Sequence, residues 1–275
     1  MSVKQAANGR RYSEIEFEVD GTPEEVWEAI ATGPGISSWF VPARVEERDG
    51  KAVAMTYTFG PGMEPRADIT VWNPPHTFTG QGEVYGGGAP PVATEWIIEA
   101  RAGGTCLIRM VHSLFASTDE WDNQLEGAEM GWSGFLRTLR IYLKHFRGQR
   151  AAIMQLTTPV ECTEAEAWQT LTSALGLHDV KVAQSWTTLA GVAPLGGVVE
   201  YLSAEPFDAL VRLDTPGPAI AAFGVATYPN GPTVAAMNLY IYGDDRDARV
   251  ARETPLWSAF LQKLFPVPAD AEASD

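Results

Sequence analysis

The sequence predicts an α+β protein of two tandem helix-grip units, in each of which a curved antiparallel sheet surrounds a long C-terminal helix. Two internal matches support this fold. The segment VDGTPEEVWEAI at residues 19–30 aligns without a gap with VECTEAEAWQTL at 160–171, and WSGFLRTL at 132–139 returns as WSAFLQKL at 257–264. Because both matches keep the same order at opposite ends of two halves, they indicate a tandem repeat. At 275 residues, the chain is long enough for two domains of ordinary size.

The first element of the first unit is a half-buried strand at residues 12–19. Ile15, Phe17 and Val19 alternate with glutamates, so the apolar side chains share one face and the acidic ones the other. We therefore expect this strand to lie on the core with its glutamates in solvent.

A helix follows in each unit, and both helices begin with the same capping signal. Thr22 precedes a proline and two glutamates, and Thr163 precedes two glutamates, which suit the first turn of a helix. Gly176 supplies a C-terminal stop for the second of these helices. The side chains expected to face the core are Val26, Trp27 and Ile30 in the first unit and Ala167, Trp168 and Leu171 in the second.

The middle of each unit predicts an antiparallel meander. In the first unit, three pairs of strands are joined by the short turn sequences RDG, NPPH and AGG. These strands are predicted at residues 45–47, 51–59, 66–72, 77–84, 92–100 and 105–114. The strands of the second unit are predicted at 198–202, 209–213, 219–228 and 233–242.

Each unit ends in an amphipathic helix. In the first unit, apolar side chains recur on one helical face, and burying each contributes on the order of 1.5–3 kcal/mol. They are Trp132, Phe135, Leu136, Leu139, Tyr142, Leu143 and Phe146. The second helix stops before Pro266, about two turns sooner, because proline disfavours helix in the residue before it. We therefore expect the roomier interior in the first unit and a more tightly filled second unit.

Composition argues against several classes of partner. The net charge of −15, from 35 acidic and 20 basic residues, disfavours nucleic acid and anionic membranes. The first residues, MSVKQAANGRRYSE, hold no apolar core of a signal peptide, and no apolar segment is long enough to span a membrane, so we expect a cytoplasmic protein. The two cysteines and four histidines lack metal-site spacing, and we predict no metal and no cofactor.

Five further segments of the first unit carry a family resemblance. After the first helix come WF at 39–40, VWNPPHTF at 71–78, GGT and VHSLF between 103 and 115, and MGW at 130–132. In this order, over residues 11–148, they resemble the START-like (SRPBCC) superfamily, and within it the activators of heat-shock protein 90 ATPase (AHSA-type). The resemblance implies the START/Bet v-like helix-grip fold with a pocket between sheet and long helix.

The rest of the chain fits this resemblance less closely. Residues 151–266 resemble a degenerate second copy, which keeps the capped helix and the closing WSAFL but lacks the NPP and HSLF segments. For residues 267–275, rich in alanine and acidic side chains, we predict a disordered tail.

His112 is the histidine best placed to face such a pocket. On the strand at 105–114 it shares a face with Ile108 and Met110, whereas Arg109 belongs to the opposite face. A neutral imidazole there could bind a ligand oxygen or act as a base. The alternative is a core histidine bonded to a backbone carbonyl. The candidate lining residues are Tyr57, Trp72, Trp96, Ile98, Met110, His112, Trp132 and Phe135.

These features favour binding of an apolar or aromatic small molecule, in a role related to stress. One alternative is a polyketide cyclase- or hydrolase-like enzyme that acts on a bound aromatic substrate through His112 or a tyrosine. The sequence holds neither GxSxG nor a phosphate-binding loop, and we assign no catalytic residue. A third function, a co-chaperone that activates a heat-shock ATPase, is implied by the resemblance alone. The second unit is expected to pack on the first or to support self-association.

Overall fold

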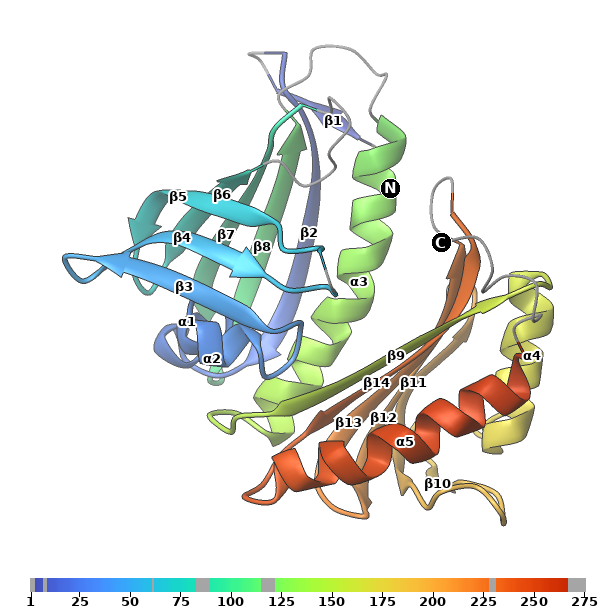
Figure 1. Cartoon of the computed structure of the whole chain (residues 1–275). Helices are drawn as coiled ribbons and strands as arrows, with labels where there is room; N and C mark the ends of the chain where they lie inside the picture. The colour runs from blue at the N-terminus through green and yellow to red at the C-terminus, as the bar shows by residue number, and fades with distance from the viewer. Residues whose placement is uncertain are drawn as a thin grey trace. The chain divides into compact units, whose positions relative to one another are not determined.

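The chain divides into two compact units, Met1–Arg150 and Ala151–Asp275, each with its own sheet (Figure 1). The structure, a computed structural model, describes residues 3–6, 9–60, 62–82, 90–114, 122–227 and 231–266. The tail predicted at 267–275 and the strand ends predicted at 83–84 and 228 lie outside these residues.

The first unit contains an eight-stranded antiparallel sheet in the order β1-β2-β8-β7-β6-β5-β4-β3. The strands predicted from alternation are confirmed, with small differences at their ends. The short strand β1 was not predicted. The strands are β1 Lys4–Gln5, β2 Arg11–Asp20, β3 Ala43–Arg48, β4 Lys51–Tyr57, β5 Arg66–Asn73, β6 Thr77–Gly82, β7 Val92–Arg101 and β8 Thr105–Leu114.

Helix α1, Pro23–Ala31, begins with a complete capping box. The Glu25 amide donates to Thr22 Oγ1 at 3.4 Å, and the Thr22 amide donates to Glu25 Oε2 at 2.8 Å. The helix buries the expected face, including Trp27, against the sheet. A four-residue helix that was not predicted, α2 at Gly33–Ile36, follows directly.

The long helix α3, Asp122–His145, lies along the sheet and packs chiefly against β2 (Figure 1). Five of the seven apolar side chains predicted for its inner face are buried: Leu136, Leu139, Tyr142, Leu143 and Phe146. The other two, Trp132 and Phe135, are only partly buried. They lie on the N-terminal side of the buried five, where the interior of the unit is not filled.

The second unit repeats this topology with a six-stranded sheet in the order β10-β11-β12-β13-β14-β9. In both units, the strand before the first helix pairs with the strand before the last helix, which is the helix-grip connection. The strand β10 was not predicted. The elements are β9 Ala152–Val160, α4 Glu164–Leu175, β10 Ser185–Thr187, β11 Gly196–Ala204, β12 Phe207–Thr215, β13 Ala219–Thr227, β14 Thr233–Ile241 and α5 Arg246–Leu264.

The core of the second unit lies between its sheet and its two helices. Trp168 of α4, Trp186 of β10 and Trp257 of α5 are buried in one apolar cluster with branched side chains of β11 to β14. Thr163 forms the predicted capping box, and Gly176 ends α4 in the left-handed conformation at φ 73°. The sequence did not predict that Arg249 of α5 would be buried, with its guanidinium donating to the carbonyl of Gly217 at 3.0 Å.

The described residues lack two kinds of feature. None of their helices is long and apolar enough to cross a membrane. Within the same residues, no three histidine, cysteine or acidic side chains are grouped as metal ligands would be.

Candidate ligand-binding cavity

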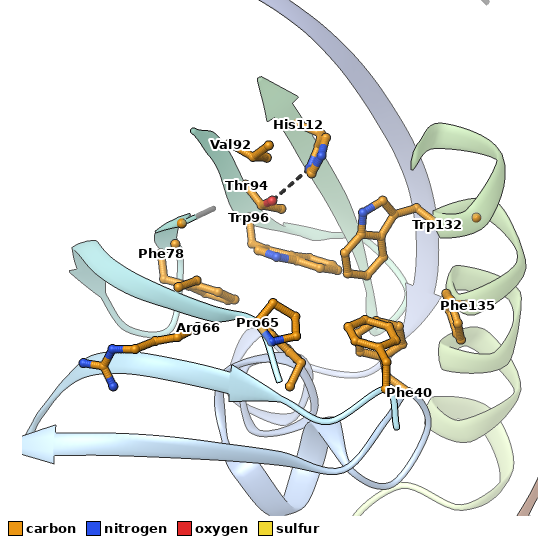
Figure 2. Close-up of a pocket in the computed structure, with 16 residues that line it drawn as sticks. Phe40, Pro65, Arg66, Phe78, Val92, Thr94, Trp96, His112, Trp132 and Phe135 are labelled. Carbon is orange, nitrogen blue, oxygen red and sulfur yellow. Dashed lines mark hydrogen bonds between the residues drawn. The ribbon is translucent and has the colours of Figure 1, made fainter. Parts of the chain in front are cut away.

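A cavity of about 220 Å³ lies inside the first unit, between the sheet and the middle of α3 (Figure 2). Its walls come from β4 to β8, from the segment after α2 and from one face of α3. The lining residues are Phe40, Tyr57, Phe59, Pro65, Arg66, Ala67, Phe78, Gly80, Gly82, Val92, Thr94, Trp96, His112, Gly131, Trp132 and Phe135.

Aromatic rings in mutual contact form one continuous wall of the cavity. Trp132 of α3 meets Trp96 of β7 edge-on, with ring centroids 5.6 Å apart, and stacks on Phe40 at 5.1 Å. Phe40 in turn meets Phe135 edge-on at 4.4 Å. On the sheet, Trp96 stacks against Phe78 at 6.1 Å. Each such pair contributes about 0.5–1.5 kcal/mol beyond area burial, so these contacts tie α3 to the sheet and give the wall a defined shape.

Small residues on β6 leave the space that the cavity occupies. Phe78, Gly80 and Gly82 alternate along this strand and therefore belong to the same face. A Cβ atom at Gly82 would lie 2.3 Å from the Arg66 carbonyl oxygen, and one at Gly80 would lie 3.3 Å from Ala67 Cβ. The glycines thus let β5 and β6 approach closely and leave the inner face without side chains at two successive positions.

Thr94 and His112 form a polar pair in the otherwise apolar lining. The two residues are direct partners across β7 and β8, and Thr94 Oγ1 lies 2.9 Å from His112 Nδ1. Either atom donates, depending on the imidazole tautomer. His112 is only 4% exposed, and burial lowers its pKa to about 4, so the imidazole is neutral at pH 7.

Tyr57 and Arg66 also line the cavity, but neither brings a charge into it. The Tyr57 hydroxyl donates to Met55 Sδ at 3.4 Å, and burial raises the pKa of Tyr57 to about 12, so it stays neutral. Arg66 directs its guanidinium away from the aromatic rings (Figure 2), where it pairs with Glu46 and, through Nε, with Asp68 at 3.3 Å.

The structure brings five of the eight predicted lining residues to the cavity: Tyr57, Trp96, His112, Trp132 and Phe135. His112 lies on the inner face of β8, the face that it shares with Ile108 and Met110 by strand alternation. Arg109, on the opposite face, is half-buried.

The structure does not bring the other three predicted residues, Trp72, Ile98 and Met110, to this cavity. Trp72 packs edge-on against Trp27 of α1 at a centroid distance of 4.7 Å, so α1 covers it. Ile98 and Met110 lie on the correct faces of β7 and β8 but are only 2% and 1% exposed. They belong to the filled part of the core, because alternation specifies the face of a residue and not its position along the cavity.

The lining residues that sequence reasoning missed include Phe40, the two β6 glycines and Thr94. The sequence did hold a signal for the missed residues that lie on strands. Thr94 precedes Trp96 by two residues and therefore shares its face, and glycine at two inward positions of one strand indicates unfilled space. Phe40 follows α2, whose path the sequence did not predict.

The fold and the cavity define a helix-grip protein whose first unit has a hollow, aromatic-lined interior. The profile of the family described as "Activator of Hsp90 ATPase homolog 1-like protein" matches residues 20–144. These residues include every lining residue of the cavity. The first unit therefore belongs to this family. The search among curated protein sequences found no match.

Comparison with solved structures gave similarities over one unit and over both. The di-domain ARO/CYC BexL from the BE-7585A biosynthetic pathway is 14% identical, over 94% of this chain and 99% of that chain, with a TM-score of 0.45. CalU16 from Micromonospora echinospora is 21% identical, over 52% of this chain and 83% of that chain, with a TM-score of 0.41. The Aha1 dimer from Colwellia psychrerythraea is 18% identical, over 50% and 98%, with a TM-score of 0.39.

Proposed function

We propose that the first unit binds one small apolar or aromatic molecule in the cavity between its sheet and α3. The observation that supports this most directly is an aromatic-walled space of about 220 Å³ inside a folded domain. An engineered apolar cavity of about 150 Å³ in another protein stays dry and binds benzene. The present cavity is larger, so it has room for a compact ligand of one or two rings, whose transfer from water is favourable.

The protonation state of His112 favours binding over catalysis. Proton transfer to or from a bound substrate in a cyclase- or hydrolase-like reaction is most efficient when the pKa of the catalytic group lies near the operating pH. With a pKa of about 4, His112 is neutral but only a weak base, and Tyr57, with a pKa of about 12, is a weak acid. A stress-related role and the co-chaperone alternative rest on the family description alone. Failure to recover a heat-shock ATPase with the full chain would remove the co-chaperone alternative.

Calorimetric titration of the full chain with naphthalene tests the proposal. We expect one molecule to bind per chain, and Ala67→Phe, which adds a ring to the lining at β5, to weaken binding by at least about tenfold. Val71→Phe is the matched control, because Val71 lies on the same strand, is 45% exposed and does not line the cavity. Binding that Ala67→Phe leaves unchanged would place the ligand elsewhere and refute the proposal.

A further inference from the structure

We propose that the bound molecule is a neutral aromatic compound that carries a hydroxyl group, held by Thr94 in its hydrogen-bonded pair with His112. This inference rests on the proposed function above and names the chemistry of its ligand. It follows from the hydrogen-bonding capacity of Thr94, from the position of the pair in the aromatic wall and from the absence of an inward charge among the lining residues that the structure describes.

Thr94 retains hydrogen-bonding capacity after pairing with His112. A threonine hydroxyl offers one donor and two acceptor positions, and the contact with Nδ1 uses one of them. Within the described part of the chain, the Thr94 hydroxyl forms one hydrogen bond, the one to His112. If the imidazole donates, the Thr94 hydroxyl is left to donate to the ligand. If the imidazole accepts, the Thr94 oxygen is left to accept a hydrogen bond from the ligand.

A ligand hydroxyl suits both cases, because it donates as well as accepts. A carbonyl oxygen would fit only the tautomer in which the imidazole donates, because only then is the Thr94 hydrogen free to donate to it. An ammonium group finds an acceptor lone pair on Thr94 in either tautomer, but it brings a charge into the apolar lining, which is costly. The hydroxyl is therefore the functional group that this pair recognises whichever tautomer is present.

The position of the pair fits a ring with a polar end. Thr94 and Trp96 lie on the same face of β7, about 7 Å apart along the strand, as two residues require. Figure 2 shows the Thr94–His112 pair next to the Trp96 ring, with Trp132 on the facing side. A two-ring aromatic that lies against Trp96 would reach Thr94 with a hydroxyl on its edge.

The lining also selects against a charged ligand. Among the described lining residues, Arg66 is the permanently charged one, and its guanidinium points outward to Glu46 and Asp68. His112 and Tyr57 are neutral at pH 7. A carboxylate would therefore lose its hydration with no cation to replace it, which is costly in an apolar site.

The test compares three probes of similar shape on the full chain at pH 7: naphthalene, 1-naphthol and 1-naphthoate. The informative quantity is the ratio of the naphthalene Kd to the 1-naphthol Kd, measured in the native protein and in Thr94→Val, which keeps the shape and removes the hydroxyl. We expect this ratio to fall by about 3- to 10-fold in the variant. Thr94→Ser, which keeps a hydroxyl, should retain the native ratio, and 1-naphthoate should bind at least about tenfold more weakly than 1-naphthol.

The outcomes separate this inference from the proposed function. If naphthalene and 1-naphthol both bind and Thr94→Val leaves the ratio unchanged, the hydroxyl inference is overturned and the binding function stands. If 1-naphthoate binds as tightly as 1-naphthol, the requirement for a neutral ligand is overturned. If neither neutral probe binds, the proposed function fails and this inference fails with it. Circular dichroism of Thr94→Val and Thr94→Ser confirms that each variant is folded before its ratio is used.

Discussion

Burial sets the charge of the imidazole that lines the cavity. His112 is 4% exposed on β8, and its ring pairs with the neutral hydroxyl of Thr94. The loss of hydration disfavours the protonated form, and the pKa falls to about 4. The cavity therefore keeps a neutral interior over most of the pH range in which proteins work.

This shift makes folding stability depend on pH. Between pH 6.5 and 4, the unfolded chain protonates His112 whereas the folded chain leaves it neutral, so stability falls as the pH falls through this window. From pH 7 to pH 5, the contribution of His112 to the free energy of unfolding should drop by about 2 kcal/mol. Glutamine is polar but does not titrate. Over this interval, the free energy of unfolding of His112→Gln should therefore fall by about 2 kcal/mol less than that of the native protein. Urea unfolding of both proteins at the two pH values measures it, and equal losses would show that His112 titrates normally.

At the scale of an element, the close approach of α1 and α2 depends on one glycine. A Cβ atom at Gly35 would lie 1.9 Å from the carbonyl oxygen of Glu28 and 2.9 Å from Ala29 Cα, both backbone atoms of α1. These atoms cannot rotate away as a side chain would. Because Phe40 enters the cavity wall directly after α2, the packing of the two helices also positions that ring.

Gly35→Ala should therefore destabilise the first unit, by about 2 kcal/mol or more. Gly131→Ala is the control, since Gly131 lies in α3 and a Cβ atom added there would meet nothing within 4 Å. There, alanine should be neutral or should stabilise the helix by about 0.5–1 kcal/mol. Thermal and urea unfolding distinguish the two variants, and a Gly35→Ala protein as stable as Gly131→Ala would contradict the close packing.

The elements also show what sequence patterns could and could not predict. Alternation predicted β7 and β8 almost to their last residues, and the capping boxes at Thr22 and Thr163 predicted the starts of two helices. The helix α2 was missed because a Gly-Pro-Gly segment is typical of a helix stop. Whether an inward side chain such as Met110 meets filled core or open space depends on contacts between distant segments, and periodicity carries no information about those.

At the scale of the whole molecule, each of the two units forms its own sheet from its own strands. Every strand of the first sheet, and every residue that lines the cavity, comes from Met1–Arg150. All the strand pairs of that sheet therefore form within about half of the chain, which is a usual size for a domain.

A protein of residues 1–150 alone should thus fold and bind naphthalene with a Kd within about threefold of the full chain. Residues 151–275 alone should fold without binding it, and they serve as the control. Circular dichroism, cooperative unfolding in urea and calorimetric titration test this. If the first segment does not fold or does not bind, the cavity depends on the second unit.

The two units also show how little distinguishes a hollow helix grip from a solid one. Strands β6 and β12 occupy equivalent places, each third from the strand that precedes the first helix of its unit. Where β6 presents Phe78, Gly80 and Gly82 to its interior, β12 presents Ala209, Val211 and Leu213, which belong to the filled core. The capacity of this architecture to hold a guest can therefore be gained or lost through a few side chains on one strand, while the connections, caps and long helix that build the fold stay the same.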